Sequence, residues 1–314
     1  MKYWLGVTDN KWFSFQEKHR FDEVNFWQPS ATPPFKNAPE GMPFLFKLKK
    51  PYNHIVGGGF FIAYSSLPIK MAWETFGTKN GVNSFSELHA IIAPLTGGNK
   101  KNNDIGCTIL TNPFFFNPSD WIETPSSFSS NIVRGKMYDT LKTEGAELWN
   151  MVIKRLDNHR EFITNLDNTT LSEKDILETA EKYGTPYLTR SRIGQGSFRL
   201  LVTDAYKRRC AITGESTLPV LEAAHIIPYA EGGTHDISNG LLLRSDFHKL
   251  YDLGLISITP DYKVKVSSNI RESWFNGKAY YRLQDQSLAS IPDNHHHKPN
   301  RDFLDWHFKN RFIT

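Results

Sequence analysis

The stretch LEAAHIIP, residues 221–228, is a short apolar segment with the histidine His225 at its end. Behind it, Asn239 follows a Gly-Gly loop, and His248 and Asp252 lie four residues apart in a segment with helical spacing. Strand, loop and helix in this order predict a ββα unit. Hydrolysis of a phosphodiester needs a general base and a divalent cation, and imidazole and carboxylate groups can provide both the base and the cation ligands.

The motif resembles the HNH (ββα-metal) nuclease family. The shared landmarks are an Ala-His-Ile-x-Pro strand end, a Gly-Gly loop, an Asn-Gly-Leu after it and a histidine on the following helix. A wider frame resembles one HNH subfamily, through GQGSFR (194–199), CAITG (210–214) and LRSDFHKLYDLGL (243–255). The resemblance runs from Arg192 to the end of the chain and implies a DNA endonuclease.

The resemblance also implies a role for each residue of the motif. His225, neutral at pH 7, is expected to take a proton from the attacking water. Asn239 is expected to hold the loop against the strand without touching DNA. His248 is expected to bind a divalent cation, Mg²⁺ or Mn²⁺, with Asp252 as a second ligand on the same helix face. The alternative is that His248 and Asp252 form an ordinary i,i+4 surface pair.

One position departs from the family pattern. Many HNH enzymes place an aspartate or histidine directly before the base as a metal ligand, and here Ala224 stands at that position. Glu222, two residues earlier, is the expected replacement, reaching the ion directly or through water. A salt bridge to a nearby arginine is the equal alternative for Glu222. The Cys-x-x-Cys zinc clip of some relatives is excluded, because Thr213 occupies the place of the second cysteine after Cys210.

The charge of the chain is uneven. From Arg190 onward there are 17 Lys and Arg against 13 Asp and Glu, so the net charge of +4 lies with the motif. This mild excess favours nucleic-acid binding and is equally compatible with solubility alone. Four arginines are candidate contacts to DNA phosphates, each with an ordinary solvated charge as the alternative: Arg199, Arg208, Arg209 and Arg244.

The N-terminal half is rich in short β-like segments. Strands are expected at 3–7, 43–48, 55–64 and 105–110, and helices at 68–76 and 84–92. Gly57, Gly58 and Gly59 interrupt the third strand and indicate a bulge or a close backbone approach. The opening Tyr-Trp-Leu and the Phe-Leu-Phe-Lys-Leu segment resemble PUA-like domains of the EVE and ASCH types, which bind modified nucleobases. The resulting fold class is α+β, with a β-barrel-like PUA-type domain ahead of the ββα-metal domain.

A pocket for a flipped, modified base is expected in this half. Aromatic rings stack on a base while polar groups bond its Watson–Crick edge. Trp27, Asn25 and Gln28 combine both kinds of group in one short segment. The alternative for aromatic residues such as Trp4 and Phe61 is simple core packing, and alternation along 44–49 favours the core for Phe44, Phe46 and Leu48.

Three regions follow from these patterns: a recognition domain over 1–160, a helical linker over 161–190 and an endonuclease domain over 191–314. From about Lys136 to Leu156 apolar residues recur at helical spacing, and Ser172 is a predicted N-cap for a helix over 173–183. With two cysteines, no apolar leader and no membrane-length apolar run, a cytoplasmic protein is expected.

Together, a reader of modified bases and an HNH nuclease indicate a modification-dependent, type IV-like restriction enzyme that recognises modified cytosine in double-stranded DNA. A double-strand break needs two active sites or two visits, so a homodimer is an expectation. One alternative is an HNH endonuclease that is indifferent to modification. Another is a non-catalytic DNA-binding module with a decayed site, which the alanine at position 224 favours.

Overall fold

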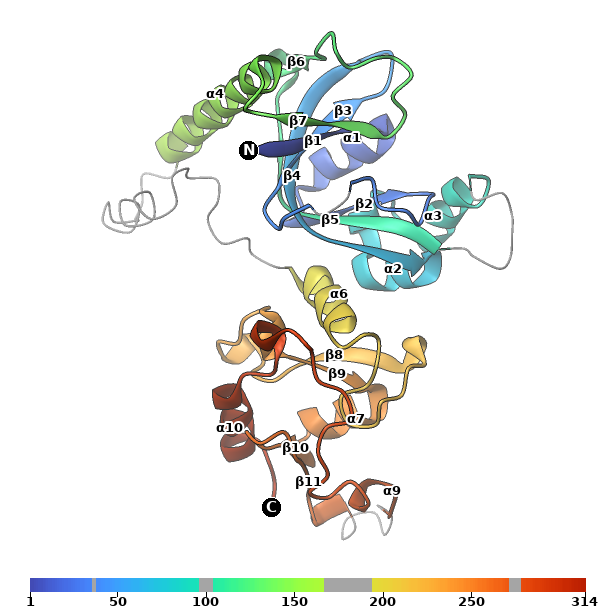
Figure 1. Cartoon of the computed structure of the whole chain (residues 1–314), viewed down its shortest axis with the longest axis vertical. Helices are drawn as coiled ribbons and strands as arrows, with labels where there is room; N and C mark the ends of the chain where they lie inside the picture. The colour runs from blue at the N-terminus through green and yellow to red at the C-terminus, as the bar shows by residue number, and fades with distance from the viewer. Residues whose placement is uncertain (36–37, 96–103, 167–193, 271–277) are drawn as a thin grey trace. The chain divides into compact units, whose positions relative to one another are not determined.

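The chain divides into two units, residues 1–192 and 193–314, in this computed structural model. The structure describes residues 1–35, 38–95, 104–166, 194–270 and 278–314. The expected α+β class is confirmed, because both units combine strands and helices (Figure 1). The helix expected over 173–183 and most of the expected linker lie outside the described residues.

The described part of the N-terminal unit is built on one mixed sheet. Its strands pair in the order β2-β5-β4-β3-β1-β7, with β6 paired to β4. Strands β1 and β3 run parallel, and the other neighbours are antiparallel. In chain order the elements are β1 (Lys2–Thr8), α1 (Asn10–His19), β2 (Glu23–Gln28), β3 (Pro43–Leu48), β4 (His54–Pro68), α2 (Ile69–Phe76), α3 (Phe85–Ile92), β5 (Asp104–Phe115), β6 (Ile122–Glu123), β7 (Gly135–Asp139) and α4 (Thr143–Leu166).

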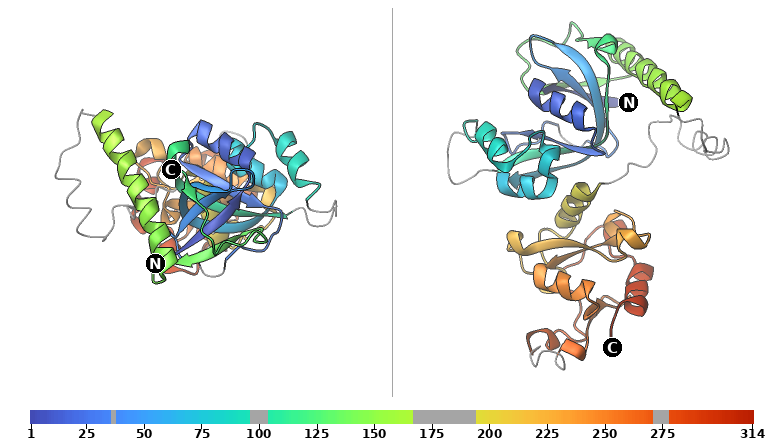
Figure 2. Two further views of the ribbon diagram at one scale, coloured as in Figure 1. Left: turned by 90° about the horizontal axis from the view of Figure 1, so that it is seen from above. Right: turned by 180° about the vertical axis from the view of Figure 1, so that it is seen from behind.

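Both faces of this sheet are covered. Alternate residues of a strand point to opposite faces, so Phe44 and Phe46 enter one apolar cluster and Leu45 enters another. Helix α1 packs on the first face with Trp12 and Phe13, and α4 packs on the second, so the two helices lie on opposite sides of the β1–β3 pair (Figure 2). The expected core residues of β3 are therefore buried, and so are the residues between them.

The glycines of β4 allow the expected close approach. A Cβ on Gly57 would lie 2.2 Å from the carbonyl oxygen of Phe114, so no side chain fits there. The register of β4 against β5 shifts between Gly58 and Phe60, which is a bulge.

The helix predicted from Lys136 is wrong over its first residues. Tyr138 lies in strand β7, opposite Tyr3 of β1, and Leu141 is exposed in the turn that follows. Strand pairing along β1 satisfies the backbone of 135–139, which outweighs the helical spacing of the apolar side chains. Helix α4 begins at Thr143, and its Leu148 and Val152 are buried as predicted.

The described part of the C-terminal unit has α6 (Gln195–Ala205), β8 (Leu221–His225), β9 (Gly240–Arg244), α7 (Ser245–Asp252), β10 (Ile256–Ile258), β11 (Val264–Val266), α9 (Lys278–Tyr281) and α10 (Arg301–Asn310). Strands β8 and β9 form an antiparallel hairpin that places His225 opposite Gly240. Helices α6 and α7 pack on the two sides of this hairpin (Figure 1). One apolar cluster joins them, with Phe198 of α6 and Phe247 of α7 among its members.

Candidate active site

The expected strand, loop and helix come together around the β8–β9 hairpin. Strand β8 ends at His225, the 3₁₀ turn Ile237–Asn239 closes the loop, and α7 follows β9 directly. Ala224 is fully buried in the core behind the site. The hairpin is short, and its buried residues Leu221, Ala224, Leu241, Leu242 and Leu243 belong to the apolar cluster of this unit.

The His225 ring is held by two neighbours. It stacks on Phe198, with ring centroids 3.9 Å apart and planes at 9°. Its Nε2 lies 2.9 Å from Nδ1 of His235. Among the described residues, Nδ1 of His225 has no hydrogen-bond partner. Burial, with smaller contributions from His235 and His248, lowers the pKa of His225 from 6.5 to about 4. The imidazole is therefore neutral at pH 7, which is the form a general base needs.

Asn239 is buried and fixes the loop that follows β8. Its Oδ1 accepts from the backbone N–H of Ile227 at 2.9 Å. Its Nδ2 donates to the carbonyl of Ile227 at 3.0 Å and to that of Thr234 at 2.8 Å. The side chain thus joins both ends of the loop through hydrogen bonds to backbone groups.

His248 of α7 lies between two carboxylates. Oε2 of Glu222 lies 2.6 Å from its Nδ1, and Oδ2 of Asp252 lies 3.4 Å from its Nε2. The Asp252 contact is the i,i+4 pair expected on one face of α7, whose other face buries Phe247 and Tyr251. Glu222 bonds this histidine and forms no ion pair with an arginine among the described residues.

This arrangement fits a divalent cation held by two protein ligands. Neighbouring ligands of an octahedral Mg²⁺ are about 3.0 Å apart, close to the 3.4 Å between His248 Nε2 and Asp252 Oδ2. Glu222 contacts the other ring nitrogen, Nδ1, at 2.6 Å, the position of a carboxylate that orients a metal-binding histidine. No cluster of three metal-ligating side chains occurs among the described residues. Water and phosphate oxygens would complete the coordination shell.

The four candidate phosphate-binding arginines differ in their surroundings. Arg244 makes two bonds of 2.6 Å to Asp246, which raise its pKa. Arg208 lies 3.8 Å from Asp204. Arg209 is exposed, and Arg199 is partly buried on α6. Arg209 is consequently the most accessible of the four, and the guanidinium of Arg244 is already bound to Asp246.

Sequence reasoning missed His235. Its ring bonds His225 and stacks on the exposed Tyr229, with centroids 4.7 Å apart and planes at 7°. The residue lies ten positions after His225, in a loop without periodic structure. The only available signal was its place next to Gly232-Gly233, because the contact depends on loop closure by Asn239.

A cavity of about 1060 Å³ lies in the N-terminal unit. Trp27 and Gln28 line it, together with Trp12, Phe15 and Phe26. Trp27 donates from Nε1 to the carbonyl of Asn80 at 3.0 Å, so one edge of its ring is fixed. The prediction for Asn25 is wrong: its buried amide donates to Asn80 at 2.9 Å and to Sγ of Cys107, and it does not line the cavity.

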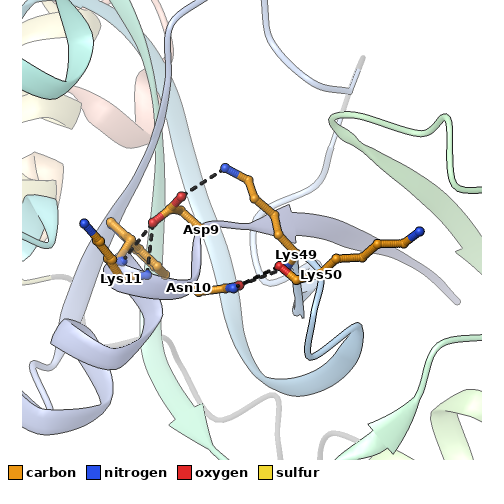
Figure 3. A network of polar contacts seen from close by, with 6 residues as sticks. Asp9, Asn10, Lys11, Lys49 and Lys50 are labelled. Carbon is orange, nitrogen blue, oxygen red and sulfur yellow. Dashed lines mark hydrogen bonds and ion pairs between the residues drawn. The ribbon is translucent and has the colours of Figure 1, made fainter.

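One side of this cavity is basic. Figure 3 shows Asp9 and Asn10, at the start of α1, facing the Lys49–Lys50 segment after β3. Nζ of Lys49 lies 3.0 Å from Asp9, and Asn10 accepts from the Lys49 backbone N–H at 3.0 Å. Lys11 and Lys50 are exposed and have no ion-pair partner among the described residues. The cavity therefore joins aromatic walls to free positive charge at its edge.

The described residues hold no helix with the length and apolar character needed to cross a membrane. The structure is similar to that of an ASCH protein from Zymomonas mobilis, with 10% identity and a TM-score of 0.32 over 48% of this chain and 94% of that one. It is also similar to the modification-dependent TagI restriction endonuclease, with 14% identity and a TM-score of 0.27 over 93% of this chain and 76% of that one. TM-scores of this size establish neither a common fold nor a common function.

No curated protein matches the chain in sequence. A family model does match part of it, over residues 210–259, and its description is HNH endonuclease. This range contains His225, His235, Asn239, His248 and Asp252. The HNH resemblance of the C-terminal unit is thereby confirmed: residues 210–259 are similar to the HNH endonucleases.

Proposed function

We propose that the protein is a metal-dependent endonuclease that hydrolyses double-stranded DNA with His225 as general base. The observation that carries the proposal is the HNH match over 210–259 together with a half-buried, neutral His225 beside the His248–Asp252 pair. A single histidine or a single i,i+4 pair is common in proteins. The presence of His225 and of the His248–Asp252 pair around the same β8–β9 hairpin supports a catalytic role.

In the proposed reaction His225 accepts a proton from water as the water oxygen attacks phosphorus and the bond to the 3′-oxygen breaks. His248 and Asp252 would hold the cation, Mg²⁺ or Mn²⁺, and Glu222 would orient His248. The bound cation supplies the charge that polarises the phosphate and stabilises the departing oxygen. Asn239 keeps the loop closed over the base.

The N-terminal cavity supports a role in choosing the DNA. Its volume of about 1060 Å³ is ample for a flipped nucleotide, since ligand pockets typically span about 300–1,000 Å³. The Trp27 ring offers a stacking surface, Gln28 a polar edge, and Lys11 and Lys50 charges for the flanking phosphates. We therefore propose a modification-dependent, type IV-like restriction enzyme that reads a modified cytosine in this cavity.

The test is cleavage of phage DNAs that carry different cytosine modifications, beside unmodified DNA, with Mg²⁺, Mn²⁺ or EDTA. Wild type, His225→Ala and Trp27→Ala are compared. The full proposal predicts that wild type cuts only modified DNA and only with a metal. His225→Ala should not cut at all, and Trp27→Ala should cut modified and unmodified DNA equally.

Two other outcomes separate the alternatives. Equal cutting of all DNAs by wild type, unchanged in Trp27→Ala, would retain the nuclease and discard the reader. Binding without cutting under every metal would indicate a DNA-binding module, the reading that Ala224 favours.

A further inference from the structure

The His225–His235 contact joins two aromatic residues through their ring nitrogens. Nε2 of His225 and Nδ1 of His235 are 2.9 Å apart, and their ring planes meet at 57°. Two neutral imidazoles can share one proton at such a contact in only two ways, because one nitrogen donates and the other accepts. The direction of this bond decides which nitrogen of His225 is free to act as a base.

We propose that His235 is a positioning residue whose Nδ1 accepts the hydrogen bond from Nε2–H of His225 and so leaves Nδ1 of His225 unprotonated toward the attacking water. This inference rests on the proposed nuclease function. In the opposite direction His225 would carry its proton on Nδ1 and could not accept another there. In many active sites a carboxylate accepts a hydrogen bond from the histidine base and so fixes its tautomer. His235 would do the same for His225 without adding a negative charge.

Stacking contacts hold both rings for this bond. His225 lies flat on Phe198 and His235 lies flat on Tyr229, so neither ring turns without losing an aromatic contact. The backbone is held as well, because Asn239 donates to the carbonyl of Thr234, directly before His235. Asn239 therefore acts on the base through His235, in addition to closing the loop.

The chain offers a matched pair of substitutions. In asparagine, Oδ1 stands at the same bond position as Nδ1 of histidine, so His235→Asn keeps an acceptor. In phenylalanine, a ring carbon stands there, so His235→Phe keeps the stack on Tyr229 and loses the acceptor. A role in packing alone predicts that phenylalanine is the better replacement, and the proposed role predicts asparagine.

The experiment combines cleavage rates with ¹⁵N-histidine NMR of the full-length protein. We expect wild-type His225 to be protonated at Nε2 at pH 7, and His235→Phe to lose that preference and to cut about 10- to 100-fold more slowly. His235→Asn is expected to keep both the Nε2 protonation of His225 and the wild-type cleavage rate. A wild-type His225 protonated at Nδ1, or equal rates for wild type and His235→Phe, would overturn the inference.

The NMR readout needs no cleavage. If wild type fails to cut any DNA, the proposed function fails, and the protonated nitrogen of His225 still decides the role of His235. If His235→Phe does not fold, the wild-type spectrum and His235→Asn carry the test.

Discussion

Oε2 of Glu222 lies 2.6 Å from Nδ1 of His248, on the opposite ring edge from Asp252. A strand residue thus fixes the ring of a helix residue, and Nε2 is directed toward the Asp252 carboxylate. Hydrogen bonds of this kind set the tautomer and the orientation of metal-binding histidines. The two carboxylates therefore lie on opposite sides of the ring, and in the proposed site Asp252 is a cation ligand whereas Glu222 orients His248.

The first prediction concerns cation affinity. Asp252→Asn removes a ligand charge and is expected to weaken Mn²⁺ binding more than Glu222→Gln, which keeps an acceptor for His248. We expect about a 10- to 100-fold loss for Glu222→Ala. Isothermal titration with Mn²⁺ measures this, with Asp305→Asn, a surface carboxylate paired to Lys309, as control. Unchanged affinity in Glu222→Ala would remove Glu222 from the site.

The second prediction concerns the pH dependence of cleavage. Burial holds the pKa of His225 at about 4, below its ordinary 6.5, so the base stays neutral through the weakly acidic range. Single-turnover cleavage, at a Mn²⁺ concentration that saturates the protein at every pH, should therefore show no acid limb near pH 6.5 and should fall only as the pH approaches 4. Circular dichroism at each pH verifies that the protein is folded. A rate that halves near pH 6.5 would contradict the assignment.

The site could be predicted from sequence as far as local pattern determines structure. The apolar segment before His225 and the helical spacing of His248 and Asp252 are local signals, and the strand and helix are where they predict. The contact between Glu222 and His248 depends on how α7 packs against β8, which the sequence of a short segment does not determine. His235 reaches His225 only through the closed loop.

The N-terminal unit shows the same limit. Trp27 and Asn25 lie two residues apart on β2, and sequence gives no reason to separate them. The structure does so because Asn80 and Cys107 take up the amide of Asn25. Tyr138 has helical spacing to later residues, but residues 135–139 form strand β7 because they pair with the edge of β1. Partners distant in sequence decide both cases.

The third prediction concerns His307 and stability. The ring is buried, stacks on Tyr251 at 3.7 Å and lies 2.9 Å from Oγ of Ser257. Burial lowers its pKa from 6.5 to about 4. Between pH 6.5 and 4, His307 is therefore protonated in the unfolded chain and neutral in the folded chain. The contribution of neutral His307 to the free energy of unfolding is complete above pH 6.5 and is lost as the pH falls toward 4.

Denaturant unfolding at pH 7.5 and 4.5 tests this. Between those values wild type should lose about 2–3 kcal/mol more stability than His307→Gln, which retains a polar group for Ser257 and does not titrate. His295→Gln, an exposed histidine, is the control. Identical pH dependence in wild type and His307→Gln would contradict the prediction.

The fourth prediction concerns the basic edge of the N-terminal cavity. Lys50 is exposed and lies beside the Asp9–Lys49 pair without an ion-pair partner of its own among the described residues (Figure 3). If its ammonium group neutralises one DNA phosphate, Lys50→Ala lowers the slope of log K against log salt by about 1. Lys18→Ala is the matched control, because Lys18 is exposed on α1, has no ion-pair partner among the residues the structure describes and does not line the cavity. Fluorescence anisotropy with a modified duplex, in the His225→Ala background to prevent cutting, measures both slopes. Equal slopes for the two lysine variants would place the DNA backbone away from this edge, whereas a reduced slope in Lys50→Ala alone would place it there and tie the cavity to substrate binding.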